Sequence, residues 1–358
     1  MTQAVALAQQ ASTGVSQGFK NRIINGAMVI DQRNAGASVT PTNGQFSVDR
    51  WAAELSQSSK FSFQQNAGAV TPPVGFTDYL GVTSLSAYTV GSGEVFNIYQ
   101  RIEGFNIADL GFGSAQAKTI CLSFWVRSSL TGTFGGAIQN SANNRSYPFS
   151  YTINAANTFE YKTVTVDGDT SGTWLTTNGN GMAVRFSLGA GATYSGTAGA
   201  WAGSDFRSAT GATSVVGTNG ATFFITGVQL EVGSTATSFD YRSYGTELAL
   251  CQRYLPSYIY SSSSGSEVIG WVRGLSTASF ASAGISFTVT ARVPPTGATV
   301  SGTYVVSGLS FSTVAFNYAS LNFGALSLSG GSGMTVNNVY ELQCSTAGSK
   351  ILFTGCEL

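Results

Sequence analysis

The feature that most constrains this chain of 358 residues is the strict alternation of apolar and polar side chains in short segments. In residues 119–127 (TICLSFWVR) and 181–189 (GMAVRFSLG), every second residue is a large apolar one. Successive side chains of a strand point to opposite faces, so this pattern predicts strands with one covered face. Clusters of Gly, Asn, Ser and Thr separate these segments, as in TTNGNG at 176–181, and predict turns. Many short strands without interleaved helices predict an all-β sandwich or jelly roll and disfavour a Rossmann fold or an (α/β) barrel.

Three further segments extend the β pattern. Residues 221–232 (ATFFITGVQLEV) place Phe224, Val228, Leu230 and Val232 on one face, and Phe223 and Ile225 on the other. This strand is therefore predicted to be buried on both sides at its start. Residues 284–293 (GISFTVTARV) predict another strand, and residues 350–358 (KILFTGCEL) predict the last one.

One short helix is predicted in the middle of this β pattern. Thr246 can cap a helix that begins at Glu247, and Pro256 ends it. Its apolar residues Leu248, Cys251 and Leu255 are spaced i, i+3, i+7 and form one stripe. The chain thus divides into a lead (1–20), a first β domain (21–245), a connecting helix (246–255) and a smaller β domain (256–358).

Composition excludes several classes of function. Only 9% of residues are charged and the formal net charge is zero, so the clustered Lys and Arg that phosphate contacts need are missing, and no nucleic-acid partner is expected. No apolar run approaches the ~20 residues of a membrane helix, so no membrane insertion is expected. The chain has no histidine, which removes Ser-His-Asp triads and His-ligated metals. No CxxC occurs among the four cysteines, and Cys344 and Cys356 could meet across neighbouring strands.

Five segments in order resemble a known family. They are NRIINGAMVIDQRNAGASVT at 21–40, FSVDRWAA at 46–53, VDGDTSGTW at 166–174, GMAVRFSLGAG at 181–191, and FFITGVQLEVGSTATSFDYRSYGTELALCQRYL at 223–255. Together they resemble the carbohydrate-binding-module-like jelly-roll domain of bacteriophage and prophage tail fibres. The resemblance covers about residues 21–255. It implies a jelly-roll sandwich followed by the short helix and a second, smaller β domain at a distal tip.

The resemblance also implies a non-enzymatic virion protein that attaches to a host cell-surface glycan. It implies a homotrimer. The low charge suggests either that much of the surface is covered in an assembly or that the surface is coated with hydroxyls and amides. Residues 1–20 are either a free tail or a segment that orders only against a partner, and in the second case they would dock to other tail or capsid proteins. Leu248, Cys251 and Leu255 would pack three helices around an axis. No cofactor is expected, apart from the structural calcium that jelly-roll modules often hold. By position, Asp31 and Glu231 are nearest to such a site, although Ala27 stands where the family has an acidic residue.

Aromatic residues outside the predicted core are the candidates for glycan contact, because sugar C–H faces stack on aromatic rings. Trp51 is expected in the core, and Trp125 points away from the apolar side of its strand. The candidates are Trp174 beside a turn, Trp201 in a Gly-rich loop, and Tyr258, Tyr260 and Trp271 in the second domain.

Two alternatives remain open at this stage. The protein could decorate a capsid as a head fibre, or it could be a capsule-degrading glycan hydrolase. A hydrolase needs two carboxylates in one cleft, and the pairs Asp167 with Asp169 and Asp205 with Glu231 are candidates. The regular short repeat of a β-helix, the fold of many capsule-cleaving spikes, is missing.

Overall fold

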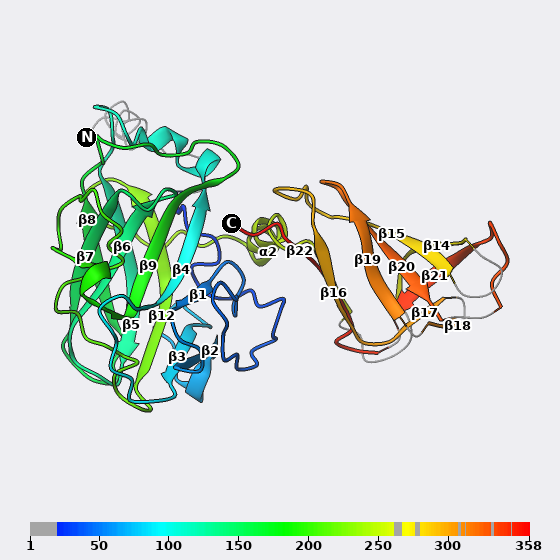
Figure 1. The fold of residues 1–358 in the computed structure, drawn as a ribbon, viewed down its shortest axis with the longest axis horizontal. Helices are drawn as coiled ribbons and strands as arrows, with labels where there is room; N and C mark the ends of the chain where they lie inside the picture. Colours follow the sequence, from blue (N-terminus) through cyan, green and yellow to red (C-terminus); the bar gives the residue numbers. More distant parts are fainter. Residues whose placement is uncertain are drawn as a thin grey trace, which may run out of the picture.

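A computed structural model describes residues 20–260, 267–275, 280–306, 309–311, 313–330, 333–344 and 346–358. Figure 1 shows an elongated molecule in which a larger sandwich and a smaller β domain lie on either side of helix α2 (Tyr244–Gln252). The predicted fold class is confirmed as all-β, with a jelly-roll sandwich, a short helix and a second β domain. In the part of the chain that the structure describes, no helix has the length and apolar character to cross a membrane. The predicted docking segment, apart from Lys20, lies outside these residues.

Two five-stranded antiparallel sheets form the sandwich, and the chain passes repeatedly between them. The first, called here the β9 sheet, has the order β1 (Ala52–Leu55), β4 (Val95–Glu103), β9 (Asn180–Ala190), β6 (Gly132–Asn140) and β7 (Ser146–Ile153). The second, called the β12 sheet, has the order β2 (Phe61–Gln65), β3 (Leu80–Ser84), β12 (Thr222–Val232), β5 (Ile120–Ser128) and β8 (Glu160–Val166). The minor elements are β10 (Ser195–Gly196), β11 (Ser208–Ala209), and the 3₁₀ turns η1 (Ala67–Ala69), η2 (Gly104–Asn106), η3 (Ala108–Leu110) and η4 (Ala192–Tyr194).

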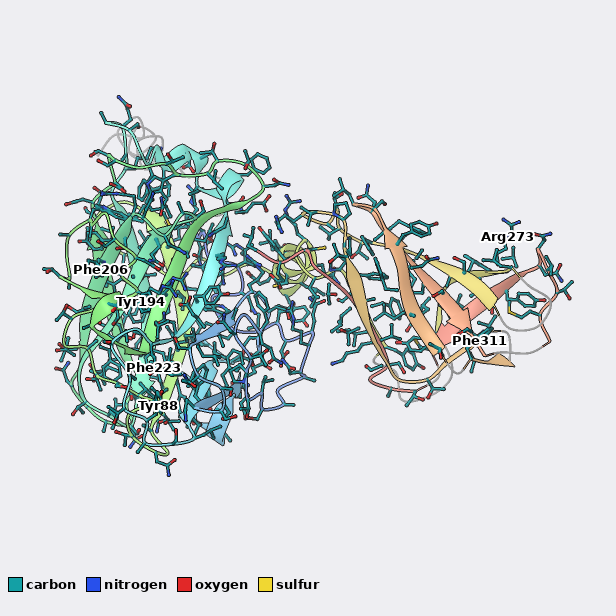
Figure 2. All side chains as sticks on the ribbon, viewed as in Figure 1. Tyr88, Tyr194, Phe206, Phe223, Arg273 and Phe311 are labelled. Carbon is teal, nitrogen blue, oxygen red and sulfur yellow. The ribbon has the colours of Figure 1, made fainter. Side chains whose placement is uncertain are left out.

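The alternation in the sequence places the core correctly for β5 and β9. The apolar residues of both strands, Ile120, Leu122, Phe124, Val126, Met182, Val184, Phe186 and Leu188, belong to one buried cluster between the sheets. Figure 2 shows side chains filling this space. Trp51, expected in the core, is fully buried there, and its indole N–H donates to the Asn25 carbonyl at 3.1 Å.

Strand β12 departs from its predicted faces because it contains a β-bulge. Its register with β5 shifts between Thr226 and Gln229, and Gly227 has φ +60°. The extra residue reverses the parity of the strand, so Val228 and Leu230 join the core face that Phe223 and Ile225 occupy. Phe224 packs on the opposite face against Tyr79, with ring centroids 5.2 Å apart, and Val232 is exposed. The prediction of one shared face was wrong, whereas burial on both sides at the start of β12 is confirmed.

Helix α2 begins three residues earlier than predicted. Ser243 is its N-cap, and the Ser243 hydroxyl accepts from the Thr246 N–H at 3.4 Å. Glu247 lies in the first turn, where it accepts a hydrogen bond from the Asn25 N–H and pairs with Arg242 at 3.2 Å. These contacts attach the helix to the sandwich, and the helix ends at Gln252 rather than Leu255.

The apolar stripe of this helix faces its own chain. Cys251 is fully buried with Tyr254 against Ile24 and Ile30 of the sandwich, and Leu248 packs against the same cluster. Leu255 is also buried, with 1% of its surface exposed. The assignment of Cys251 and Leu255 to a trimer interface is therefore corrected, because their side chains are covered without a second copy.

The second domain packs a three-stranded sheet on a seven-stranded one. The small sheet has the order β13 (Ser257–Ile259), β22 (Lys350–Thr354) and β16 (Gly297–Ser301). The large sheet has the order β18 (Leu309–Ser310), β17 (Tyr304–Val306), β21 (Val339–Cys344), β14 (Glu267–Gly274), β15 (Phe280–Ser286), β20 (Phe323–Ser329) and β19 (Thr313–Ala319). The strand predicted over 284–293 ends at Ser286. Beyond it the Arg292 N–H donates to the Arg253 carbonyl at 2.8 Å, so the chain turns to the joint instead of continuing the sheet.

The four cysteines are buried free thiols, so Cys344 and Cys356 do not form the disulfide that the sequence left open. The Cys356 thiol donates to the Val293 carbonyl at 3.1 Å. Burial raises the pKa of both Cys344 and Cys356 to about 11, which keeps them protonated at neutral pH.

The joint between the domains is crossed twice, because residues 355–358 run back to the sandwich (Figure 1). Glu357 pairs with Arg33 at 2.7 Å and also with Arg50, and the Leu358 carbonyl accepts from Arg101 at 2.9 Å. Beside helix α2, the Glu103 carboxylate of β4 accepts two hydrogen bonds from Arg253, at 2.6 and 2.9 Å, and one from the Tyr254 hydroxyl at 2.6 Å. These contacts attach two segments to the same surface of the sandwich. One is the segment that leaves the sandwich after helix α2, and the other is the C-terminal segment that returns to it.

We predict that Glu103→Gln lowers the free energy of unfolding by about 2 kcal/mol, measured by urea denaturation at pH 7, because it leaves Arg253 without a charged partner. Burial alone would raise the pKa of Glu103, but Arg253 and Tyr254 hold this pKa below its ordinary value of 4.5. The stabilisation is therefore complete above pH 4.5 and is lost as the pH falls further.

The matched control is Asp109→Asn, which breaks the exposed pair with Arg22. It should cost less than about 1 kcal/mol. Equal losses for the two variants would contradict the role given to Glu103 at the joint.

Candidate functional site

A groove of about 590 Å³ lies on the outer face of the β12 sheet. Strands β5 and β8 supply Trp125 and Tyr161, and the bulge of β12 supplies Gly227. The remaining lining comes from two loops that lead into β3 and out of β12, and comprises Val74, Phe76, Ala236, Thr237, Ser238, Phe239 and Tyr241, with Ser123 of β5. The groove is thus built from segments far apart in the sequence.

Aromatic rings form both walls of the groove. On one side the rings of Trp125 and Tyr161 lie 5.4 Å apart with an angle of 50° between their planes. On the other side Phe76, Phe239 and Tyr241 pack mutually, with ring centroids 4.9 to 5.6 Å apart. Tyr161 is 43% exposed and Tyr241 is 59% exposed, so ring surface from both walls faces solvent. Mutual packing holds the exposed rings in place.

The bulge at Gly227 gives the groove its depth. A Cβ atom at this position would lie 2.6 Å from the Phe76 ring and 3.1 Å from the Trp125 ring. Together with φ +60°, this close approach makes glycine the residue that fits. The same backbone irregularity that reverses the faces of β12 therefore opens the space between the two aromatic walls.

The groove is lined by hydrogen-bonding groups without a charged side chain, and the Lys20 ammonium borders it by donating to the Thr237 hydroxyl and the Ser238 carbonyl. Its polar lining consists of Ser123, Thr237, Ser238 and the Tyr161 and Tyr241 hydroxyls, and none of the described lining residues is charged. Burial raises the pKa of Tyr241, so its phenol stays neutral. The Thr237 hydroxyl donates to Glu231 at 2.6 Å, which holds the loop over the end of β12. Such a surface can stack on apolar faces and exchange neutral hydrogen bonds.

The two residues of the sandwich that were predicted to contact a glycan, Trp174 and Trp201, lie outside the groove and pack against other side chains. Trp174 is buried, with its indole N–H 3.3 Å from Asp169, and its ring meets Trp201 edge to face at 5.5 Å. Trp201 is half-buried, and its N–H donates to the Asp167 carbonyl at 2.7 Å. The structure therefore places Trp174 in the core instead of on an exposed platform.

The predicted residues of the second domain divide between core and surface. Tyr260 is buried in the domain core and Tyr258 packs against it. Trp271 of β14 is 61% exposed and stands apart from the groove. Glycan contact by Trp271 stays a prediction.

The two residues proposed for a structural calcium serve separate loops. Asp31 accepts from the Asn34 and Gly36 N–H groups at 2.8 and 2.7 Å, and Glu231 accepts from Gln229 and Thr237. Within the described ranges, no three Asp, Glu, Cys or His side chains gather as a metal site would require. A calcium held by Asp31 and Glu231 stays a prediction.

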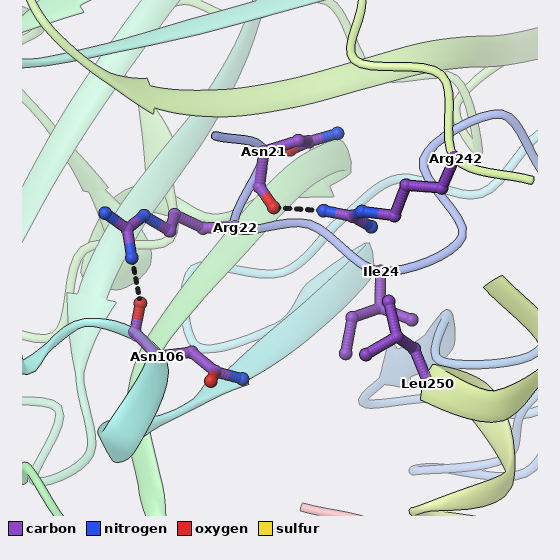
Figure 3. A pocket seen from close by; sticks show the side chains of 6 residues that line it. All are labelled: Asn21, Arg22, Ile24, Asn106, Arg242 and Leu250. Atoms are coloured by element: carbon purple, nitrogen blue, oxygen red, sulfur yellow. Dashed lines mark hydrogen bonds between the residues drawn. The ribbon is translucent and has the colours of Figure 1, made fainter. Parts of the chain in front are cut away.

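A smaller pocket, of about 180 Å³, lies beside the start of the described chain (Figure 3). There Arg242 donates to the Asn21 carbonyl, and Arg22 donates to the Asn106 carbonyl at 3.0 Å. Ile24 and Leu250 close its apolar side. These contacts fasten the first segment to η2 and α2, so the pocket has a structural explanation.

Sequence reasoning found one wall residue of the groove and missed the others. Trp125 stood out because it alternates with the core residues of its strand. Tyr161 carries the same signal, since it lies on the exposed face of β8. Phe76, Phe239 and Tyr241 lie in loops without periodicity, and their association is visible only in three dimensions.

Comparison with known proteins finds no matching family model and no matching curated protein. Solved structures with similar regions include the enzymatically active domain of tailspike protein 4 of bacteriophage CBA120, at 13% identity and a TM-score of 0.33. That match covers 60% of this chain but only 21% of the tailspike chain.

Others are a family 11 carbohydrate-binding module from Clostridium thermocellum in complex with a mixed-linked tetrasaccharide and the N-terminal cellulose-binding domain of Cellulomonas fimi β-1,4-glucanase C. They show 12% and 14% identity and TM-scores of 0.28 and 0.24. Each match covers 57% of this chain, and 100% and 99% of the respective module. At TM-scores this low, none of these similarities assigns a function to this chain.

We predict that Gly227→Ala destabilises the protein by about 1–3 kcal/mol, because the new methyl group forces strain at positive φ and displaces Phe76. Thermal and urea unfolding measure this loss. Gly203→Ala is the control, since its Cβ would meet no atom within 4 Å, and it should change stability by less than about 0.5 kcal/mol. A neutral Gly227→Ala would show that the bulge is not constrained by the groove walls.

Proposed function

We propose that this chain binds a glycan in the groove of the β12 sheet. The observation that carries the proposal is the pair of exposed aromatic walls, Trp125 with Tyr161 and Phe76 with Tyr241, on either side of the Gly227 floor. A pyranose ring presents apolar C–H faces above and below and hydroxyls at its edge. Aromatic walls with neutral hydroxyls between them match both features.

The absence of charge in the described lining favours a neutral glycan. Ser123, Thr237 and Ser238 exchange hydrogen bonds with hydroxyls at little desolvation cost. The Lys20 ammonium at the edge of the groove already donates to the Thr237 hydroxyl and the Ser238 carbonyl, and no lining residue is cationic, so a carboxylate or sulfate would lose water without a cation placed inside the groove. We therefore infer selection for uncharged sugar units at this site.

We further propose that glycan binding serves attachment of a phage tail fibre to the host cell surface. The support is the ordered match of five segments over residues 21–255 to the tail-fibre jelly-roll domain described above. In this proposal the protein is part of the virion, residues 1–20 dock it to a tail or capsid protein, and three copies act together. Multivalency then raises avidity without a tight single site.

The proposed role is non-enzymatic. Two of the carboxylates considered for hydrolysis are committed to other partners. Asp169 forms a bidentate pair with Arg145, at 2.6 and 2.8 Å, and Asp205 forms one with Arg207, at 2.6 and 2.9 Å. An ion-paired carboxylate is a poor general acid, because the partner cation favours its ionised form.

We predict that Trp125→Ala and Tyr161→Ala each weaken binding of a neutral host-surface oligosaccharide by about tenfold, which corresponds to roughly 1.4 kcal/mol of lost stacking. A glycan array identifies the ligand, and isothermal titration calorimetry gives the dissociation constants. Phe105→Ala removes an aromatic side chain that is 59% exposed outside the groove, and should leave binding unchanged. Equal binding by wild type and both groove variants would exclude this site.

We predict that the full chain is a trimer by light scattering and that the trimer binds intact host cells, whereas Trp125→Ala trimers bind about tenfold less. Leu248→Asp should weaken the trimer, because Leu248 is the one residue of the proposed interface that is not fully buried within its own chain. A monomer at all concentrations would contradict trimer formation. Trimers that bind purified virions but not cells would favour capsid decoration.

A further inference from the structure

A second cavity, of about 530 Å³, lies at the joint between the two domains and is distinct from the groove. One wall is the outer face of the three-stranded sheet, and the opposite wall is the sandwich loop that carries Arg33, Asn34, Gln45 and Phe46. Clefts between domains are common ligand sites, because both bodies can contribute groups to one ligand. Here the cavity is lined from both domains and closed at the back by Leu255.

The sheet wall offers several unused hydroxyl groups. In the pairing of β16 with β22, Thr299 lies opposite Leu352 and Ser301 lies opposite Lys350, so all four side chains share the face toward the cavity. Thr354 lines the cavity from the same strand as Lys350. The Thr299, Ser301 and Thr354 hydroxyls form no side-chain hydrogen bond with a described residue. They are available to a ligand.

One cation at the cavity, Lys350, has no carboxylate partner among the described residues. Glu357 is shared by Arg33 and Arg50, and Arg33 also meets Asp49 at 3.2 Å. The Lys350 ammonium donates to the neutral Arg33 carbonyl, and no described carboxylate lies within ion-pair distance of it. Of the charged residues that line the cavity, Arg33 and Lys350 are cations and Glu357 is the one carboxylate, and Glu357 is paired with Arg33, so the unmatched positive charge belongs to Lys350. An anionic group at this wall would be stabilised by it.

The remaining surface of the cavity is apolar and partly aromatic. Leu255 and Leu352 are almost fully buried at its floor. Phe46 is half-buried, with the Arg33 guanidinium stacked 4.7 Å from its ring centre. Hydroxyl donors, an aliphatic floor and one cation together fit a compact polyol that carries a negative charge.

We propose that the joint cavity binds a carboxylate-bearing saccharide, with the carboxylate on Lys350, the sugar hydroxyls on Thr299, Ser301 and Thr354, and a C–H face on Leu352 and Phe46. This site differs from the groove in ligand class, since the groove favours neutral sugars. A ligand held by both walls also links the sandwich to the second domain, and so couples binding to the relative position of the two domains.

Isothermal titration calorimetry tests the proposal with two acidic probes, trigalacturonic acid and sialyllactose, and with neutral galactotriose as the matched probe. The titrations use the full chain carrying Trp125→Ala, so that failure of the groove proposal does not affect the result. We expect one acidic probe to bind, with at least tenfold weaker binding after Lys350→Gln and on raising NaCl from 50 to 500 mM. Lys118→Gln, an exposed lysine away from the joint, should change nothing.

A second variant guards against a folding artefact. Thr299 is exposed on a strand, so Thr299→Trp should fold, fill the cavity and abolish binding of the acidic probe while the unfolding temperature stays near that of the parent. The proposal is overturned if neither acidic probe binds, or if galactotriose binds equally well. It is also overturned if Lys350→Gln and Thr299→Trp both leave binding of the acidic probe unchanged.

Discussion

The β-bulge at Gly227 is the constraint on which the sandwich and its groove both depend. It adds one residue to β12 between two runs of pairing with β5, so the residues on both sides of it can face the same core. Without it, either Phe223 and Ile225 or Val228 and Leu230 would leave the core between the two sheets for the outer face of the β12 sheet. The cost is a backbone at φ +60°, a left-handed conformation that glycine adopts more readily than residues with a Cβ atom. Because Gly227 has no side chain, its backbone forms the floor between the two aromatic walls.

Much of the fold could be predicted from the sequence because the strands obey a local rule. The alternation in β5 and β9 fixes their core faces, and the helix signal at Glu247 and Pro256 places a break between two β regions. The rule fails where a tertiary feature intervenes. The bulge in β12 reverses its faces. The strand expected over 284–293 stops at Ser286, and farther along the Arg292 N–H bonds to the Arg253 carbonyl at the joint.

The candidate site was less predictable for the same physical reason. Trp125 could be singled out because a large aromatic residue on the polar side of a strand needs an explanation. Phe76 and Tyr241 come from loops separated by most of the sandwich sequence, and nothing local indicates that they meet. Conversely, Trp174 looked exposed beside a turn, yet Asp169 and Trp201 fold around it. The position of an aromatic residue in a loop or beside a turn therefore did not indicate whether its side chain is exposed.

The joint shows how a chain with so few charges uses them. Glu103 and Glu357 each serve cations that hold the outgoing and the returning chain segments against the sandwich. The apolar stripe of helix α2 packs against the sandwich of its own chain, where Cys251 is fully buried and Leu248 is partly buried. The groove, by contrast, is lined without charge. Ion pairs therefore hold the structural joint together, and neutral aromatic surface forms the proposed contact with the glycan.

The most direct test of glycan binding in the groove is an NMR titration that follows the indole N–H signals of the five tryptophans. A Trp125→Phe variant assigns the Trp125 signal. On addition of the neutral oligosaccharide selected by array screening, we expect a saturable shift of the Trp125 signal and an unchanged signal for Trp51, which is fully buried. A ligand that binds the protein while the Trp125 signal stays in place would show that the groove is not the glycan site.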